Sequence, residues 1–175
     1  MFGACGSKYG YRVSFGPLSG VRRKNHEAAR RQHILAKEVH PNNPLTYGTI
    51  GVTYETEGNL DQALQMYRKA ADLAPRAPFP LAAIGNVLAQ SGDVAGAQKV
   101  LEQLPELNQS GFGMAIVNLG LGNNSLAIQW LTTSMERREP HLLTVPFDPR
   151  FAPLREAPEF RRLLAQMGLT QAATA

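Results

Sequence analysis

Apolar and small residues recur in this sequence at a step of 34 positions, and this repetition limits the possible folds more than any other feature. Tyr47 and Gly51, for example, are followed 34 residues later by Leu81 and Gly85. A fixed step of this length is typical of an array of helical repeats. Each copy contains two groups of apolar residues spaced by three, four and seven, which places each group on one face of a helix.

A tight turn is expected between the two helices of each copy. Gly58 and Gly92 can adopt positive φ and so end the first helix. Asn59 and Asp93 follow at positions where their side chains can accept hydrogen bonds from the free amides of the next helix. The sequence therefore predicts a repeating unit of helix, turn and helix.

This pattern resembles the tetratricopeptide repeat, whose signature residues 44–77 match at nearly every position. The resemblance implies an all-α fold, a right-handed superhelix (solenoid) of stacked antiparallel helix pairs with a C-terminal capping helix. Residues 78–107 are a second copy, and residues 108–139 are a third copy at a shorter step of 30. The array, 25–139, opens on half a repeat, 25–43, because the preceding stretch is too rich in Gly and Pro for the missing helix.

The 34-residue pattern stops at Glu139, and residues 140–175 are expected to form a capping segment. Prolines divide it into two short helical turns and one helix from about 158 to 167, with Gly168 as its stop. Residues 148–155 read Asp-Pro-Arg-Phe-Ala-Pro-Leu-Arg. This ending resembles that of bacterial arrays attached to serine/threonine kinases, nucleotide cyclases or winged-helix regulators. Ala157 departs from the family pattern, which has Asp there, and Ala is a poor N-cap at a cost of about 1 kcal/mol.

The net charge of +4 is unevenly distributed along the 175 residues. Residues 1–37 carry a net +7, residues 38–136 carry −5 and residues 137–175 carry +2. Residues 1–24 are therefore predicted to be a flexible basic segment. The basic cluster between Arg22 and Arg31 suggests nucleic-acid contact as one hypothesis, but no aromatic residues interleave with it to stack on bases. A solvated helix start or tail is the favoured interpretation.

No motif for catalysis, cofactor binding or metal binding is present. Phosphate-binding glycine loops, a nucleophile elbow and the metalloprotease His-Glu-x-x-His are all absent from the sequence. His26, His33 and His40 would share one helix face but stand about 10.5 Å apart, too far to share a metal ion. We therefore expect no enzyme activity and no cofactor. Without an apolar run of membrane-spanning length or a signal peptide, a cytoplasmic location is expected.

The resemblance also places a concave groove along the first helix of each pair. Its predicted lining is mostly small, apolar or neutral: Leu45, Gly48, Val52, Glu55, Phe79, Ala82, Asn86, Gln90, Phe112 and Ile116. Relatives that hold a peptide's terminal carboxylate use Lys, Arg and Asn there, and only Asn86 fits that scheme. A carboxylate clamp is therefore disfavoured.

We expect a non-enzymatic protein-interaction module whose groove takes an extended segment or amphipathic helix of a protein partner, with Asn86 and Gln90 bonding the ligand backbone. If the chain's own C-terminal segment fills part of the groove, the contact surface moves to the convex face or the open N-terminal edge. Self-association through that edge is a further expectation. The alternative function is a truncated sensor or regulatory region of a bacterial multidomain kinase, cyclase or transcription regulator.

Overall fold

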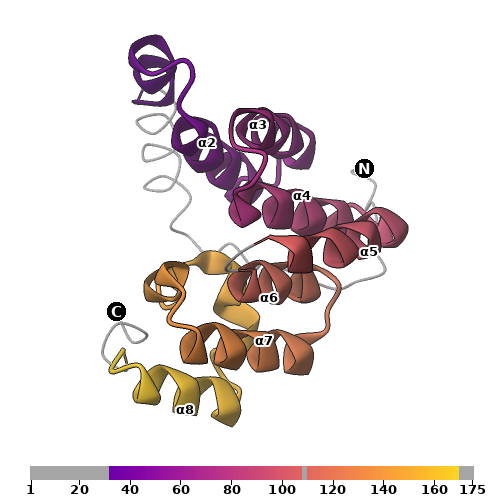
Figure 1. Cartoon of the computed structure of the whole chain (residues 1–175), viewed down its shortest axis with the longest axis vertical. Coiled ribbons are helices and arrows are strands. Elements are labelled where there is room, and N and C mark those ends of the chain that lie inside the picture. Colours follow the sequence, from indigo (N-terminus) through magenta and orange to yellow (C-terminus); the bar gives the residue numbers. More distant parts are fainter. Residues whose placement is uncertain (1–31, 108–109, 170–175) are drawn as a thin grey trace, which may run out of the picture.

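The computed structural model describes residues 32–107 and 110–169, and these residues form helices joined by short turns (Figure 1). Residues 32–39 are helical, and the elements that follow are α2 (Pro44–Thr56), α3 (Leu60–Leu73), α4 (Pro78–Gln90), α5 (Val94–Gln103), η1 (Leu104–Glu106), α6 (Gly111–Gly120) and α7 (Asn124–Glu136). The C-terminal part contains η2 (Pro140–Thr144), η3 (Pro149–Leu154) and α8 (Pro158–Gln166). No strand occurs in the described ranges, so the all-α prediction is confirmed.

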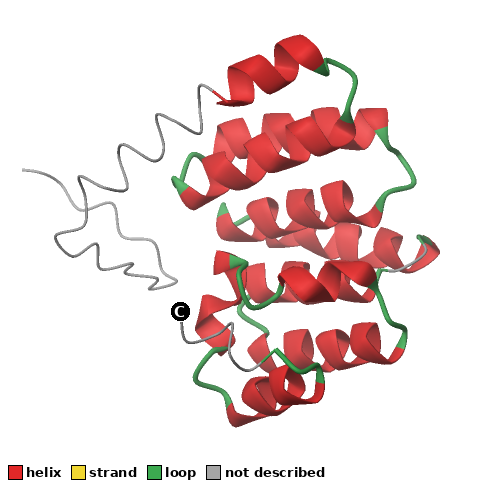
Figure 2. Ribbon diagram, turned by 90° about the vertical axis from the view of Figure 1, so that its left-hand side faces the viewer, coloured by secondary structure: helices red, strands yellow, loops and turns green. Residues whose placement is uncertain are grey.

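The helix pairs are antiparallel hairpins that stack along the long axis of the molecule (Figure 2). Gly58, Gly92 and Gly122 each have φ between +77° and +87° at the turn within a pair. This left-handed conformation is strained for a residue with a Cβ atom, which explains why glycine occupies each turn. The predicted unit of helix, turn and helix is therefore present.

Close packing within the first pair depends on Gly51. A Cβ atom placed there would lie 2.5 Å from the ring of Tyr67 on α3, well inside van der Waals contact. The absence of a side chain at Gly51 thus lets the large buried ring of Tyr67 reach the backbone of α2.

The expected caps at the two turns differ. The carboxylate of Asp93 accepts a hydrogen bond of 2.8 Å from the Gly96 amide, as predicted. The prediction for Asn59 is wrong, because its side chain makes no cap hydrogen bond. The Asn59 amide instead donates to the Glu57 carboxylate at 3.2 Å, and this neighbouring acceptor replaces the helix terminus as its partner.

Successive pairs are not joined in the same way. The first pair packs on the second mainly through α3 against α4, whereas the second packs on the third mainly through α4 against α6. This difference accompanies the shorter step of 30 residues between the second and third copies. As a result, α6 lies directly along α4.

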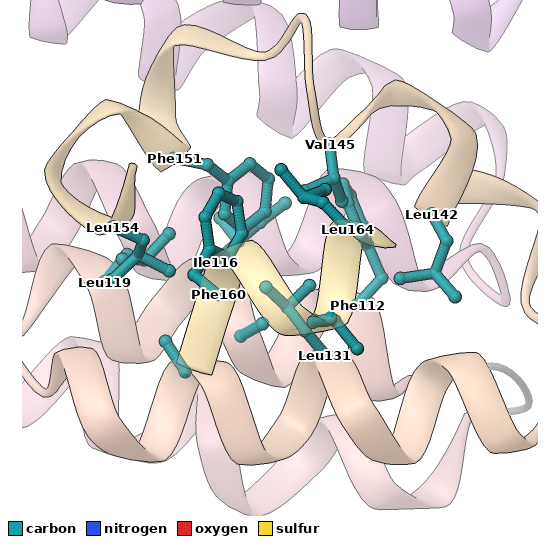
Figure 3. Packing of buried hydrophobic residues seen from close by; sticks show 13 residues of the cluster. Phe112, Ile116, Leu119, Leu131, Leu142, Val145, Phe151, Leu154, Phe160 and Leu164 are labelled. Carbon is teal, nitrogen blue, oxygen red and sulfur yellow. The ribbon is translucent and has the colours of Figure 1, made fainter. Parts of the chain in front are cut away.

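The C-terminal segment folds back over the third pair and closes its apolar core (Figure 3). Phe151, Leu154, Phe160 and Leu164 pack with Ile116 and its neighbours on α6 in one cluster of buried side chains. Every residue of α6 from Gly111 to Leu119 is buried. Helix α8 ends at Gln166 within a residue of the predicted limit, and Ala157 at its N-cap makes no side-chain cap hydrogen bond.

Candidate partner-binding groove

The ten residues predicted to line the groove are carried by α2, α4 and α6, but they differ strongly in exposure. Leu45 is 73% exposed, Gln90 is also exposed, and Val52 and Phe79 are half-buried. The other six are buried: Gly48, Glu55, Ala82, Asn86, Phe112 and Ile116. The exposed surface of this set therefore lies mainly at Leu45 on α2 and at Gln90 on α4.

The Glu55 carboxylate is buried and connects α2 with α3 and α4. Its oxygens accept hydrogen bonds from the Tyr67 hydroxyl at 2.6 Å, from Asn86 Nδ2 at 2.5 Å and from Gln90 Nε2 at 3.0 Å. A buried carboxylate requires such donors because leaving it unpaired would be costly. Both amide nitrogens therefore donate within the chain, to a carboxylate that lies 31 and 35 positions earlier in the sequence.

The environment of Tyr67 favours its protonated form. Burial raises the pKa of the Tyr67 phenol well above its usual value, and the adjacent Glu55 carboxylate raises it further. Tyr67 is completely buried. It therefore acts as a permanent hydrogen-bond donor inside the first pair.

A series of stacked rings crosses from α4 to the C-terminal segment. The His141 ring lies between Phe79, at a centroid distance of 6.0 Å, and Phe112, at 5.5 Å. The Phe79 and His141 planes are parallel to within 2°. Phe79 and Phe112 are both predicted groove residues, and in the structure their partner is a side chain of the same molecule.

Arg150 is a second contact between the C-terminal segment and Phe79. Its guanidinium carbon lies 5.4 Å from the centre of the Phe79 ring, and its Nη2 is 2.5 Å from the Asp148 carboxylate. Burial by itself would lower the pKa of Arg150, but the carboxylates of Asp148 and Glu55 more than offset this and hold the pKa above its usual value. Arg150 is therefore a permanent cation buried within the C-terminal segment.

Glu139 holds the start of α6 and was not singled out from the sequence. Its carboxylate accepts hydrogen bonds from the amides of Gly111 and Phe112 at 3.0 and 2.9 Å, and from the Ser134 hydroxyl at 2.7 Å. Free amides at a helix N-terminus favour a negative charge. The sequence offers no local signal for this cap, because Glu139 is 27 and 28 positions from the two amides.

The C-terminal half of the predicted groove is thus filled by residues 140–154. Ala82, Phe112 and Ile116 are buried in the apolar clusters of α4, α6 and the capping segment. On α2, Leu45, Gly48 and Val52 are spaced by three and four residues and so share one face, on which Leu45 is exposed, Val52 half-buried and Gly48 buried.

The remaining expectations concern metal binding, membrane spans and the basic N-terminal residues. No group of three His, Cys, Asp or Glu that could hold a metal ion occurs within 32–107 and 110–169. In the same ranges, none of the helices has both the length and the apolar character needed to cross a membrane. The basic cluster from Arg22 to Arg31 and the predicted segment 1–24 lie outside the part that the structure describes.

Stacked helix hairpins with glycine turns, closed by a helical cap, place this chain in the class of α-helical repeat proteins. The family model of the tetratricopeptide repeat matches residues 55–111. The chain is also 39% identical over 77 residues to the probable biofilm formation methyltransferase WspC of Pseudomonas putida, a match that covers 44% of this chain. It covers only 18% of that methyltransferase. The matched residues, 55–111, therefore form a tetratricopeptide repeat segment.

Proposed function

We propose that this chain is a non-enzymatic interaction module that binds an apolar segment or helix of a partner protein through the N-terminal part of its concave groove. Tetratricopeptide repeats serve as protein-interaction folds, and that coarser function follows from the family. The finer proposal rests on one observation. Leu45 is 73% exposed on the face of α2 that also carries Gly48 and Val52.

The chemistry of this stripe favours an apolar ligand. Gly48 adds no side chain to the surface, and a Cβ atom there would lie 3.5 Å from the Phe79 ring. Leu45 and Val52 therefore lie on either side of a position without a side chain, next to the Phe79 ring. An amphipathic helix or an extended segment can place one apolar side chain between them.

A substitution of Leu45 tests this proposal without disturbing the fold. Peptides selected from a displayed random library on the full chain are measured against the wild type and Leu45→Lys by fluorescence polarisation. We expect Leu45→Lys to weaken binding by at least about tenfold, equal to ~1.4 kcal/mol. Leu126→Lys, a change at another exposed leucine, is the matched control and should leave affinity unchanged.

Selected peptides whose affinity is the same for the wild type and Leu45→Lys would place the binding surface elsewhere. The convex face would then become the leading candidate. Self-association through the N-terminal edge is a separate prediction, and its readout is the oligomeric state.

A second candidate function is a regulatory region that serves a signalling enzyme. The match to a methyltransferase favours this second function. It covers only 18% of that protein, so the region similar to this chain is a small part of a longer enzyme. The measurement is methyl transfer from radiolabelled S-adenosylmethionine. A docking region without its own catalytic centre should give no transfer, and turnover by the purified chain would contradict a non-enzymatic role.

A further inference from the structure

Exposed apolar side chains gather on the helix at residues 32–39. Ile34, Leu35 and Val39 are 58%, 52% and 66% exposed. On a helix these three positions fall within one side of the cylinder. The helix therefore presents an apolar face, which we call the N-terminal face, to solvent.

The opposite side of the same helix already packs against α2. His33 Nε2 lies 3.4 Å from the hydroxyl of Thr53, and the Lys37 ammonium lies 5.9 Å from the centre of the Tyr47 ring. Docking on α2 therefore leaves the N-terminal face uncovered. Its apolar character is not explained by contact with the next helix pair.

Comparison with the later repeats shows that the array does not need apolar residues at two of these three positions, although Val39 is followed by leucine at 73 and 107. A step of 34 takes Ile34 and Leu35 to Arg68 and Lys69 on α3, both exposed. A further step of 34 leads to Glu102 and Gln103 at the end of α5, also exposed. Charged or polar side chains suit these outward positions. The apolar pair on the helix at residues 32–39 therefore indicates that a partner covers it.

The size of the N-terminal face argues against a second copy of the chain as that partner. Three partly exposed aliphatic side chains offer an apolar area on the order of a few hundred Å², whereas a stable dimer interface buries roughly 1,200–2,000 Å² in total. A small patch is better matched by a segment of the same chain. Its tether gives a high local concentration and removes most of the entropic cost of association.

The sequence just before this helix contains such a segment. Tyr9, Tyr11, Val13 and Phe15 are large, apolar or aromatic, and alternate along the chain, so an extended conformation would place them all on one side. Residues 1–24 carry five basic side chains and no acidic one, while Glu38 lies between Ile34 and Val39 on the N-terminal face. We propose that residues 9–15 of the same chain pack across Ile34, Leu35 and Val39 and close the open edge of the array.

Hydroxyl-radical footprinting of the full chain, read by mass spectrometry, tests this contact. The test variant replaces Tyr9, Tyr11, Val13 and Phe15 with Ser. We expect oxidation at Ile34, Leu35 and Val39 to rise several-fold relative to the wild type. Oxidation at Val94 and Leu126, exposed residues far along the sequence, should not change. The matched control replaces Phe2 and Leu18 with Ser and should behave like the wild type.

Two results would overturn the proposal. Equal oxidation of the N-terminal face in the wild type and the test variant would show that residues 9–15 do not cover it. Protection that grows with protein concentration, accompanied by a dimer in analytical ultracentrifugation, would assign the face to a second copy. Circular dichroism of the test variant should match the wild type, because the substitutions lie outside the helix pairs.

Discussion

The hydroxyl of Tyr67 on α3 donates a hydrogen bond of 2.6 Å to the buried carboxylate of Glu55 on α2. Gly51 stands one turn before Glu55 and leaves the space that the Tyr67 ring occupies. Asn86 and Gln90 on α4 donate to the same carboxylate. This relationship ties the first helix pair together and links it to the second.

Removal of the Tyr67 hydroxyl should therefore be costly. Tyr67→Phe keeps the ring but deprives Glu55 of one donor, and we expect a loss of about 1.5–3 kcal/mol in the free energy of unfolding. Urea unfolding followed by circular dichroism measures the change. Tyr47→Phe, which removes an exposed hydrogen bond to the Pro41 carbonyl, is the control and should cost about 1 kcal/mol or less. Equal losses in the two variants would contradict a special role for the buried bond.

The raised pKa of Tyr67 predicts a loss of stability at alkaline pH. The folded chain holds the phenol proton more tightly than the unfolded chain, in which the pKa is about 10. This contribution is fully present below pH 10 and is lost progressively above it, because only the unfolded state releases the proton. Unfolding free energies of the wild type and Tyr67→Phe between pH 7 and 11 should converge as pH rises. A constant difference across this range would refute the assignment.

Glu139 should be a major contributor to the stability of the third pair. Glu139→Ala leaves two amides of α6 and the Ser134 hydroxyl without their acceptor, and we expect a loss of about 3 kcal/mol. Glu139→Gln keeps one oxygen acceptor and should cost less. Thermal and urea unfolding give the values. Glu136→Ala, at an exposed position at the end of α7, is the control and should be nearly neutral.

Helix α8 can be stabilised by supplying the missing cap. Ala157 has the extended backbone of an N-cap, with φ −72° and ψ 125°, but no side chain that can accept a hydrogen bond. Ala157→Ser should raise the free energy of unfolding by about 1 kcal/mol. Ala165→Ser inside the same helix should slightly destabilise it, since serine is a poorer helix former than alanine. A gain from both changes would point to an effect unrelated to capping.

Much of the fold could be predicted from local spacing. The 34-residue step located the first helix hairpins, and Gly58 and Gly92 marked turns whose φ values are indeed positive. Proline and glycine bounded the last helix to within a residue of its observed end. These features follow from the geometry of neighbouring residues, so they need no knowledge of distant contacts.

The candidate site was harder to predict, because its residues are paired across repeats. Asn86 and Gln90 were correctly placed on α4, but their partner Glu55 belongs to another helix pair. His141 is distant in sequence from Phe79 and Phe112, yet its ring stacks on both of theirs. Even the two similar turns diverged, since Asp93 caps its helix and Asn59 bonds to Glu57.

The sequence by itself determined that this protein is an array of helix hairpins with a terminal cap, because helical periodicity and turn chemistry act over a few residues. Only the tertiary structure decided which groove positions stay accessible. Leu45 remains exposed, whereas Phe112 and Ile116 are covered by the C-terminal segment. The physical reason is that burial depends on how the pairs stack and where the chain folds back, and a repeating pattern does not encode either one locally.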